Sequence, residues 1–487
     1  MPKDIGLPLL EAMRSLMAKR GCRYHTPGHK GRPWLAVDSS LVDMLGEGAF
    51  SADLTELPGL DNLAEPSGVL LRSEQLCAEV FGTAHTVLLT CGATSGIVAA
   101  ILACCRPGDK VLLPRECHRS VLAGVLLARA VPVFYPCDVD LEYDLPIGAS
   151  ADAIRDRLRS EPGLSALIVS SPNYFGVHRD LHAVVEEARS RRIVVIVDEA
   201  HGAHLPFVKR DLSALSWRAH IVVHSGHKTL GALTQSAMAH FTTDDPSLFG
   251  RFVSSLSLVH TSSPSYPVMA SIEAAVVRLH RSGRESLCRL MESSNQLKER
   301  LGQLEGMAVF PGSANTAGYW VDPLKVTVKL LRHRASQVER WLIEDRGMYP
   351  ELVCGQNVLF LLGIGDDQGS LDLLWNAIKA AVDVLPPQAP SSNLRWSTLL
   401  TNIPTRALLP AEAFWARQAL VPVKEAAGSI CSTPLLLYPP GVALIWPGEV
   451  FSQEMCDFLE EARANGWNVL GMVHDSKGYY VRVVEER

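Results

Sequence analysis

The middle third of the chain alternates short apolar runs with stretches of helical periodicity. Runs in which nearly every position is apolar predict buried strands at residues 87–89, 110–113, 132–135, 167–170, 193–197 and 221–224. Helical patterns occupy residues 97–105, 120–130 and 181–191. Strands that are apolar on both faces and separated by helices indicate a mostly parallel sheet covered on both sides. The pattern therefore predicts an α/β fold with right-handed crossovers.

The pattern changes beyond residue 280. A charged helical stretch at 282–304 leads out of the first domain, and strands at 325–331 and 358–362 indicate a smaller α+β unit. The Pro/Ser-rich segment 385–393 predicts a linker. We therefore expect four parts, which are an N-terminal segment 1–65, a large domain 66–300, a small α+β domain 301–388 and a C-terminal subdomain 389–487.

Composition narrows the class of protein. Of 487 residues, 47% are hydrophobic and 20% are charged, which allows large cores and excludes a disordered or fibrous chain. Lys and Arg number 46 against 52 Asp and Glu, so the net charge of −6 does not suggest a nucleic-acid-binding protein. Polar residues interrupt the uncharged stretch 86–105, and prolines interrupt 428–448. We therefore expect no membrane span.

The eleven cysteines show no C-x-x-C spacing, which is the spacing typical of zinc ribbons and thioredoxin-like redox sites. An odd number of scattered thiols in a long chain indicates free cysteines in a reducing compartment. No apolar stretch follows the charged N-terminus, so no signal peptide is predicted. These observations together predict a cytoplasmic protein.

Two charged residues occupy positions that are typical of a cofactor site. Asp198 follows the apolar run 193–197, and open parallel sheets bind ligands at the carboxyl ends of their strands. Lys228 follows thirty residues later within SGHKTLGALTQ, among small polar residues. A desolvated lysine loses its proton more readily, which frees its amine for Schiff-base chemistry. A lone lysine is more often a solvated surface residue, so this prediction depends on its neighbours.

A segment of small residues, CGATSG at 91–96, separates a predicted strand from a predicted helix. Small residues let the backbone approach an anion, a helix N-terminus offers free N–H groups, and Thr94 and Ser95 add hydroxyls. We therefore expect a phosphate-binding loop, although an ordinary helix N-cap has a similar sequence.

The tetrapeptide DEAH at 198–201 also occurs as the Walker B motif of some helicases. An ATPase of that class needs G-x-x-x-x-G-K-[ST], and the chain has no Gly-Lys-Ser or Gly-Lys-Thr. A metal site built from Asp198, His201 and His204 lacks the H-E-x-x-H spacing. We therefore expect no metal, and prefer a role for His201 in positioning the same ring that Asp198 contacts.

Nine segments together resemble the pyridoxal-phosphate (PLP) enzymes of the aspartate aminotransferase fold. Among these enzymes the chain is similar to the Orn/Lys/Arg decarboxylase family in its short form, which lacks an N-terminal wing domain. The segments keep the family's order over nearly the whole chain: HTPGHKG (25–31), DLTELPGLDNL (53–63), GATSG (92–96), ECHRSV (116–121), SPNYFGVHRDL (171–181), DEAHGAH (198–204), SGHKTLGALTQ (225–235), TSSPSY (261–266) and YPPGVALIWPGE (438–449).

The resemblance implies a role for each candidate residue. Lys228 holds PLP covalently, Asp198 pairs with the pyridinium nitrogen, His118 stacks on the ring, and His201 contacts the ring's substituent side. The other implied cofactor residues form the phosphate site or reach the cofactor of the neighbouring subunit in a homodimer with shared active sites. They are Gly92, Ala93, Thr94, Ser95, Ser225 and His227 for the phosphate, and Thr261 and Ser262 for the neighbouring subunit.

The implied reaction is decarboxylation of arginine, lysine or ornithine to the corresponding amine and CO₂. The family usually carries Arg and Glu in a G-R-I-x-x-E stretch before YPPG, and the Glu is expected near the distal cation of the substrate. Ser429 and Thr433 occupy these positions here. The loss of a charge-assisted contact weakens selection of a basic substrate by about 1.5–3 kcal/mol, so the choice of amino acid stays open.

Three alternatives also stay open. Asp53, Glu56 or Asp61 of a partner subunit are candidates for the missing counter-charge. Another PLP enzyme of the same fold, such as an aminotransferase or a lyase, breaks a different bond of the substrate. A catalytically silent regulatory protein is the third alternative, although such a chain has no chemical need for both Lys228 and Asp198.

Overall fold

The computed structural model describes residues 6–19, 21–312, 318–388, 395–476 and 478–485. The chain divides into two compact units, and each is described by itself. The first comprises Met1–Ala103 and Ile196–Ser286, and the second comprises Cys104–Val195 and Leu287–Arg487. Strand β8 (Val194–Asp198) carries the chain from the second unit into the first.

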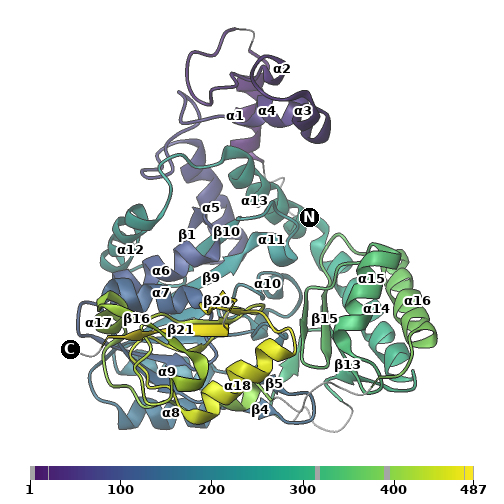
Figure 1. Ribbon diagram of the computed structural model, residues 1–487. Helices are drawn as coiled ribbons and strands as arrows, with labels where there is room; N and C mark the ends of the chain where they lie inside the picture. The colour runs from purple at the N-terminus through teal and green to yellow at the C-terminus, as the bar shows by residue number, and fades with distance from the viewer. Residues whose placement is uncertain (1–5, 20, 313–317, 389–394, 477, 486–487) are drawn as a thin grey trace. The chain divides into compact units, whose positions relative to one another are not determined.

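In the first unit, four neighbouring strands are covered by helices (Figure 1). The strand order is β1-β10-β9-β8, with β8 parallel to β9 and β10 antiparallel to both β9 and β1. The elements are β1 (His85–Leu89), β9 (Ile221–Ser225), β10 (Ala237–Phe241), α1 (Pro8–Met17), α2 (Pro33–Ala36), α3 (Ser39–Leu45), α4 (Glu47–Ala52), α5 (Val69–Phe81), α6 (Gly92–Cys104), α10 (Leu205–Val208), α11 (Gly226–Thr229), α12 (Pro246–Val259) and α13 (Tyr266–Arg278).

The packing of α6 shows why its sequence is rich in small residues. A Cβ atom at Gly96 would lie 2.7 Å from Leu89 Cδ1 and 3.1 Å from Val223 Cγ1, so only glycine lets the helix approach β1 and β9 this closely. The helix is buried at Ile97, Val98, Ala99 and the following turn, as the apolar pattern predicts.

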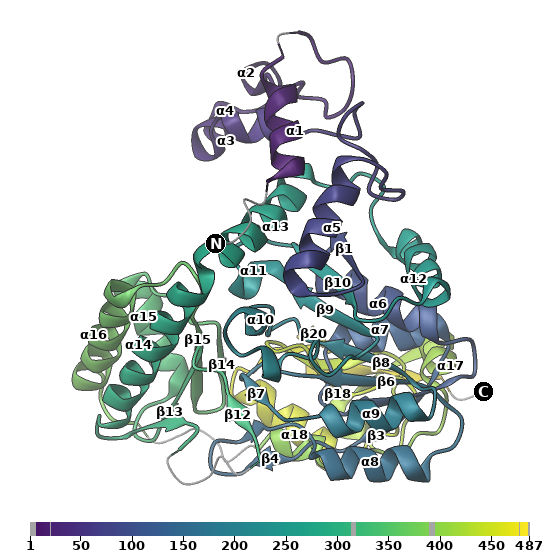
Figure 2. The same cartoon turned by 180° about the vertical axis from the view of Figure 1, so that it is seen from behind.

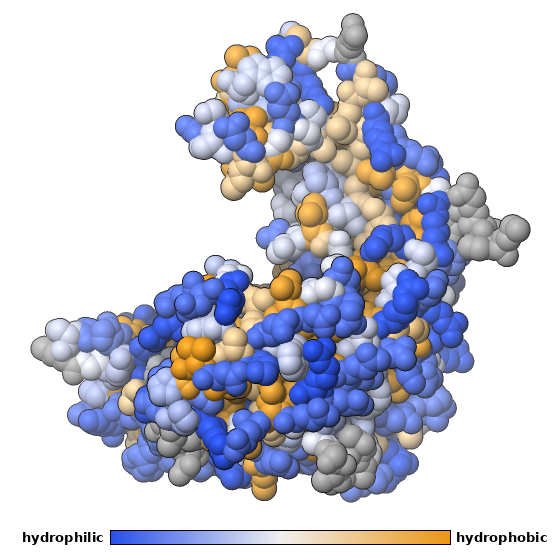
Figure 3. Space-filling model, turned by 90° about the vertical axis from the view of Figure 1, so that its right-hand side faces the viewer, coloured by the Kyte–Doolittle hydropathy of each residue, from blue (hydrophilic) through white to orange (hydrophobic). Residues whose placement is uncertain are grey.

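Helices α1 to α4 form the upper lobe in Figures 1 and 3. Several large apolar side chains of this part of the first unit are exposed, and orange and pale surfaces alternate with blue on the lobe in Figure 3. The most exposed are Tyr24 (92%), Leu35 (73%) and Met44 (72%). Exposed apolar groups at this density are typical of a surface that another chain covers.

The second unit joins several sheets around one core. The order β6-β2-β3 is wholly parallel, and the order β11-β13-β15-β14 is antiparallel, with helices on one face of the latter (Figure 2). The main elements are β2 (Lys110–Pro114), β3 (Val131–Tyr135), β6 (Leu164–Ser170), α7 (Arg119–Ala128), α8 (Ala151–Ser160), α9 (His182–Ser190), β11 (Met307–Phe310), β13 (Lys325–Leu330), β14 (Leu352–Cys354), β15 (Asn357–Leu361), α14 (Arg284–Gly302), α15 (Ala335–Arg346) and α16 (Gln368–Val384).

The C-terminal part of the second unit adds small antiparallel sheets to the same core. Buried Trp396, Val442 and Phe451 belong to one apolar cluster with Phe175 and Phe310, so the C-terminal segment packs against both earlier parts of the unit. The elements are β16 (Gln418–Pro422), β17 (Leu435–Leu437), β18 (Val442–Ile445), β19 (Val469–Leu470), β20 (Val473–Asp475), β21 (Gly478–Val484), α17 (Pro410–Trp415) and α18 (Gln453–Ala464), and the short pairs β4–β5 (Val139–Asp140, Leu145–Pro146) and β7–β12 (Val177–His178, Trp320–Val321) complete the unit.

The predicted strands and helices are found within a few residues of their expected positions. The predicted loop at 91–96 is wrong, because helix α6 already begins at Gly92, so most of that segment forms the first helical turn. The predicted linker 385–393 begins directly after α16 ends at Val384, and residues 389–393 lie outside the described residues. The expected four-part division of the chain stays a prediction.

Buried Glu74 on α5 makes the stability of the first unit depend on pH. The side chain accepts the Leu88 N–H at 3.0 Å, and burial raises the pKa of its carboxyl from 4.5 to about 8. The folded chain therefore keeps a proton that the unfolded chain releases. This contribution to stability is present below pH 4.5 and is lost as the pH rises to about 8.

We expect Glu74→Gln to flatten this pH dependence. The amide keeps an oxygen for the Leu88 N–H but does not titrate. The variant should therefore avoid the fall of about 1 kcal/mol per pH unit in the free energy of unfolding that Glu74 causes between its unfolded and folded pKa values. Urea unfolding at pH 5 and pH 8 measures the difference. Glu79→Gln, at an exposed position of the same helix, is the control and should keep the parent's slope. Equal slopes in both variants would contradict the assignment.

Candidate cofactor site

The parallel register of β8 and β9 places two predicted site residues at one edge of the first unit. Asp198 pairs with Val223, and β9 continues two residues further to Ser225. The Ala200 N–H donates to Asp198 Oδ1 at 3.2 Å, which fixes the half-buried carboxylate at the carboxyl end of its strand. Both strands are buried along their apolar positions, as expected for strands that position a site.

Lys228 lies in the short helix α11, which follows β9 directly. Its Nζ lies 2.9 Å from Nε2 of His201, a residue that is 7% exposed. The structure thus brings together Lys228 and His201, which lie far apart in the sequence and carry separate predicted roles. The neighbouring pair is also joined, because Ser225 Oγ lies 3.1 Å from His227 Nδ1.

The N-terminus of α6 supplies the predicted anion-binding groups. Gly92 has φ +74°, and its N–H donates to Gln235 O at 2.8 Å, which ties the helix start to the segment after Lys228. Ala93 is half-buried and Thr94 is exposed in the first turn. Ser95 is buried, and its Oγ donates to Gly92 O at 2.9 Å, so its hydroxyl proton is already engaged. Thr94 and the backbone N–H groups are therefore better candidates than Ser95 to donate hydrogen bonds to an anion.

Thr261 and Ser262 follow α12 and are both exposed. Thr261 Oγ1 accepts the Ser263 N–H at 3.1 Å, and within the described part of the chain no hydrogen bond joins either hydroxyl to Lys228. Their position on the surface of the first unit agrees with the expected contact to a neighbouring subunit and does not test it.

Glu199 is a site residue that sequence reasoning missed. It is fully buried next to Asp198, and its carboxylate lies 2.6 Å from His224 Nε2, accepts Ser213 Oγ–H at 2.8 Å and accepts the Ala214 N–H at 2.9 Å. A buried charge with this many partners fixes the backbone on which Asp198 is carried. The sequence feature that could have pointed to Glu199 is its position directly after Asp198 in the DEAH segment.

His118 belongs to the second unit, where it caps α7. The Ser120 N–H donates to His118 Nδ1 at 3.2 Å, and Ser120 Oγ lies 2.9 Å from the same nitrogen. The preceding residues, Arg115 to Cys117, are buried. Arg115 forms a two-point ion pair with Glu449, and burial raises the pKa of the Glu116 carboxyl to about 7. Sequence reasoning gave no role to Arg115 or Glu449.

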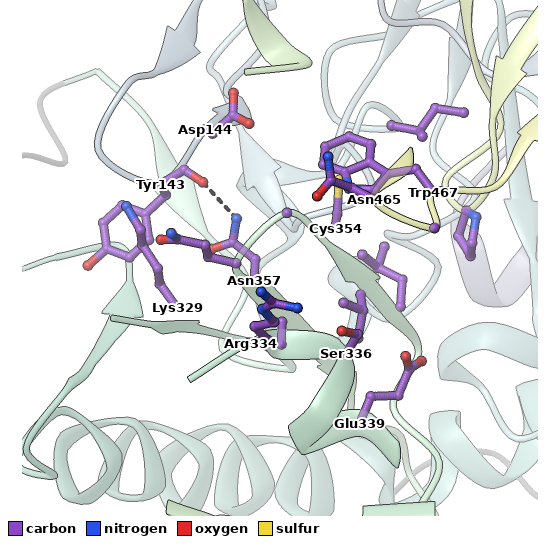
Figure 4. A pocket seen from close by; sticks show the side chains of 18 of the residues that line it. Tyr143, Asp144, Lys329, Arg334, Ser336, Glu339, Cys354, Asn357, Asn465 and Trp467 are labelled. Carbon is purple, nitrogen blue, oxygen red and sulfur yellow. Dashed lines mark hydrogen bonds between the residues drawn. The ribbon is translucent and has the colours of Figure 1, made fainter. Parts of the chain in front are cut away.

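The second unit also contains a cavity of about 760 Å³ (Figure 4). Its walls come from the 141–144 segment, the antiparallel sheet around β15 and the 465–468 segment, and Asn357 Nδ2 donates to Tyr143 O at 2.7 Å across one side. Burial raises the pKa of Asp144 to about 6. The lining mixes both signs of charge, with Glu142, Asp144, Glu339 and Glu351 against Lys329, Arg334 and Arg395. Charge alone therefore does not mark this cavity as a site for a basic ligand.

Within the described ranges, no group of three or more His, Cys, Asp or Glu side chains is arranged to hold a metal ion. No helix in the described part of the chain is both long and apolar enough to cross a membrane. All eleven cysteines are free thiols.

Comparison with known sequences decides the family. Residues 7–317 match the Orn/Lys/Arg decarboxylase major domain, and residues 396–487 match the C-terminal domain of the same family. The chain belongs to the Orn/Lys/Arg decarboxylase family. It is 33% identical over 485 residues to an arginine decarboxylase of Bacillus subtilis, covering 99% of this chain and 98% of that protein. An arginine decarboxylase of Halalkalibacterium halodurans is 30% identical over 491 residues, with 100% and 99% covered.

Solved structures show the same fold. The lysine decarboxylase LdcF of Francisella novicida superposes with a TM-score of 0.86 at 19% identity, covering 99% of this chain and 82% of that one. An alanine–glyoxylate aminotransferase of a Nostoc species superposes with a TM-score of 0.53 at 16% identity over 66% of this chain and 89% of that one. The predicted α/β fold of aspartate aminotransferase type, with a smaller C-terminal α+β part, is confirmed.

We expect Glu199→Ala to unfold more easily than the parent. The change leaves His224 and Ser213 without their shared acceptor, and removal of one member of a buried ionic group costs about 3 kcal/mol. Urea unfolding measures this loss. Glu199→Gln keeps an acceptor of the same size and should lose less, while Glu79→Ala, at an exposed position of α5, is the surface control. A loss for Glu199→Ala no larger than that of Glu79→Ala would contradict the role of this network.

Proposed function

We propose that this chain is a PLP-dependent decarboxylase whose preferred substrate is arginine. Membership in the Orn/Lys/Arg decarboxylase family supports decarboxylation of a basic amino acid. The two relatives named arginine decarboxylase that are 33% and 30% identical favour arginine, because a lysine decarboxylase of Pseudomonas aeruginosa is only 23% identical. The observation that carries the proposal is the contact between Lys228 Nζ and His201 Nε2, beside Asp198 at the carboxyl ends of β8 and β9.

The residues of the first unit fit PLP. The N-terminus of α6 offers backbone N–H groups and the Thr94 hydroxyl to a phosphate, Lys228 offers an amine, and Asp198 offers a carboxylate to a protonated ring nitrogen. Bound PLP supplies an electron sink that accepts the electron pair left behind when CO₂ departs. Asp198 keeps the proton on the ring nitrogen, because two opposite charges favour both ionised forms.

The contact with His201 explains how Lys228 becomes reactive. An ammonium group can only donate hydrogen bonds, so His201 Nε2 accepts when Lys228 is charged. At 2.9 Å a proton can pass between the two nitrogens without movement of the heavier atoms. His201 therefore helps to produce the neutral amine that Schiff-base chemistry requires, and can later return the proton.

We further propose that the protein acts as a homodimer in the cytoplasm. The exposed apolar side chains at Tyr24, Leu35 and Met44 favour burial against a second copy, and the exposed Thr261 and Ser262 are available to a partner's site. The free cysteines agree with a reducing compartment.

Lys228→Ala is expected to abolish CO₂ release from arginine and to remove the visible absorption that PLP acquires on binding a lysine. The lysine amine has no substitute in this site, because alanine cannot bond the cofactor. Both readouts are taken on protein loaded with PLP. Lys209→Ala removes an exposed lysine of the same unit and should leave both unchanged. A keto-acid product in place of CO₂, or full activity in Lys228→Ala, would overturn the proposal.

Thr433→Glu is expected to lower KM for arginine about tenfold or more. The change restores the carboxylate that the family usually carries at this position, and a charge-assisted hydrogen bond contributes about 1.5–3 kcal/mol. The half-buried Thr433 has an Oγ1 atom without a hydrogen-bond partner in the described residues, so a polar replacement loses no existing bond. Thr433→Gln matches Glu in size without its charge and is the control. Equal KM values for the two variants would show that position 433 does not contact the distal cation.

A further inference from the structure

The segment that carries His118 is held at its start by a buried ion pair with the C-terminal part of the chain. Arg115 Nη1 lies 2.7 Å from Glu449 Oε1, and Arg115 Nη2 lies 2.9 Å from Glu449 Oε2. The Arg115 side chain is 0% exposed and the Glu449 side chain 2%. The guanidinium also donates to Leu444 O at 2.9 Å, and the Trp446 N–H donates to the same carboxylate at 2.8 Å. These bonds fix both partners in one geometry.

The same segment is held at its other end three residues later. His118 and Val442 form an isolated antiparallel bridge, and the Arg119 N–H donates to Gly441 O at 3.0 Å. Residues 115–119 are thus fastened at two points to 441–449. We call Arg115, Gly441, Val442 and Glu449 the C-terminal clamp.

The clamp also borders the His118 ring itself. A main-chain N–H can only donate, so the bond from Ser120 N makes His118 Nδ1 the acceptor, and a neutral ring then carries its proton on Nε2. The Cδ2–Nε2 edge faces Gly441, where an added Cβ would lie 3.4 Å from both ring atoms. Gly441 has φ +88°, so a side chain there is strained and would also cover this edge of the ring.

Stability alone does not account for this arrangement. A buried ion pair often contributes no more to stability than apolar residues of similar size, since both charges lose their hydration. The pair instead fixes the orientation of the two side chains relative to each other, because a guanidinium and a carboxylate meet in one plane through two parallel hydrogen bonds. His118 lies within this fixed segment, two residues after the buried Glu116.

We propose that the C-terminal clamp consists of positioning residues that set the orientation of the His118 ring. The inference rests on the proposed function, and on the role that the family resemblance implies for His118, which is to stack on the cofactor ring. Three of the four clamp residues come from the C-terminal domain, which would then act on the cofactor through His118. A stacked ring has a narrow range of useful orientations, so a clamp that restricts rotation prepares the site before the cofactor binds.

The first test measures binding of 4′-deoxypyridoxine 5′-phosphate to the apo protein by calorimetry. This analogue has no carbonyl group for Lys228, so its affinity reports on ring and phosphate contacts alone. We expect Gly441→Ala to weaken binding at least fivefold, because the methyl group lies against the His118 ring. Gly108→Ala is the matched control: Gly108 has φ +89°, lies in the same unit, and has no atom within 4 Å of an added Cβ. Equal affinities in the two variants would overturn the proposal.

A double-mutant cycle separates positioning from general damage. If Gly441 acts through His118, then Gly441→Ala should cause no further loss of affinity in a His118→Ala background. A loss of the same size in both backgrounds would overturn the proposal, because the effect would then not pass through His118.

The second test needs no cofactor. We expect Glu449→Gln to raise amide hydrogen exchange across residues 117–121 of the apo protein at least fivefold, whereas Gly108→Ala should leave these amides unchanged. Unchanged exchange in Glu449→Gln would contradict the proposal that the clamp holds this segment in place. If the parent chain binds neither PLP nor the analogue, the proposed function fails, and this exchange measurement still decides whether the clamp orders the segment. If Glu449→Gln does not fold, the comparison of Gly441→Ala with Gly108→Ala decides the proposal.

Discussion

The parallel register between β8 and β9 is the constraint on which the site depends. Both strands are buried along their apolar positions and stop where polar residues begin, so Asp198 and the Ser225–Lys228 segment must appear at the same edge. The tight contact of Gly96 with Leu89 and Val223 then brings α6 and its N-terminal amides to the same unit. A slip of one residue in β8 would turn Asp198 to the other face, so burial of the neighbouring apolar residues also fixes the position of Asp198.

The parts of this arrangement that local pattern controls could be predicted. Apolar runs predicted β8 and β9, and the positions of Asp198 and Lys228 after them indicated the site before any contact was known. Strand β10 was not predicted, because its short run AMAHF carries a histidine at its fourth position. His240 is nevertheless fully buried, where its Nδ1 lies 2.9 Å from Thr86 Oγ1, so a tertiary partner overrides the polar character of the side chain.

Long-range pairs account for most of what the sequence did not reveal. Arg115 and Glu449 are separated by 334 positions, and no periodicity relates them. Glu199 is similar, because its partners His224 and Ser213 meet it only through folding. The predicted loop at 91–96 failed for a local reason, since Gly92 begins α6 in a sequence rich in helix-weakening glycine, and packing against β1 and β9 decides the outcome.

The departure at Ser429 and Thr433 concerns the residues expected near the distal cation of the substrate, and leaves Lys228, His201 and Asp198 in place. Asp198 ends β8, His201 lies in the turn that follows it and Lys228 lies in α11, all in the first unit, whereas position 433 lies in the second. A hydroxyl at 433 can accept one hydrogen bond from a guanidinium but cannot balance its charge. Because the two proposed functions are carried by separate parts of the chain, we expect loss of the carboxylate to weaken the choice of substrate without disturbing the groups proposed to break the bond. We expect arginine, whose planar cation offers five donors, to lose less from this replacement than lysine, whose compact ammonium depends more on a facing charge.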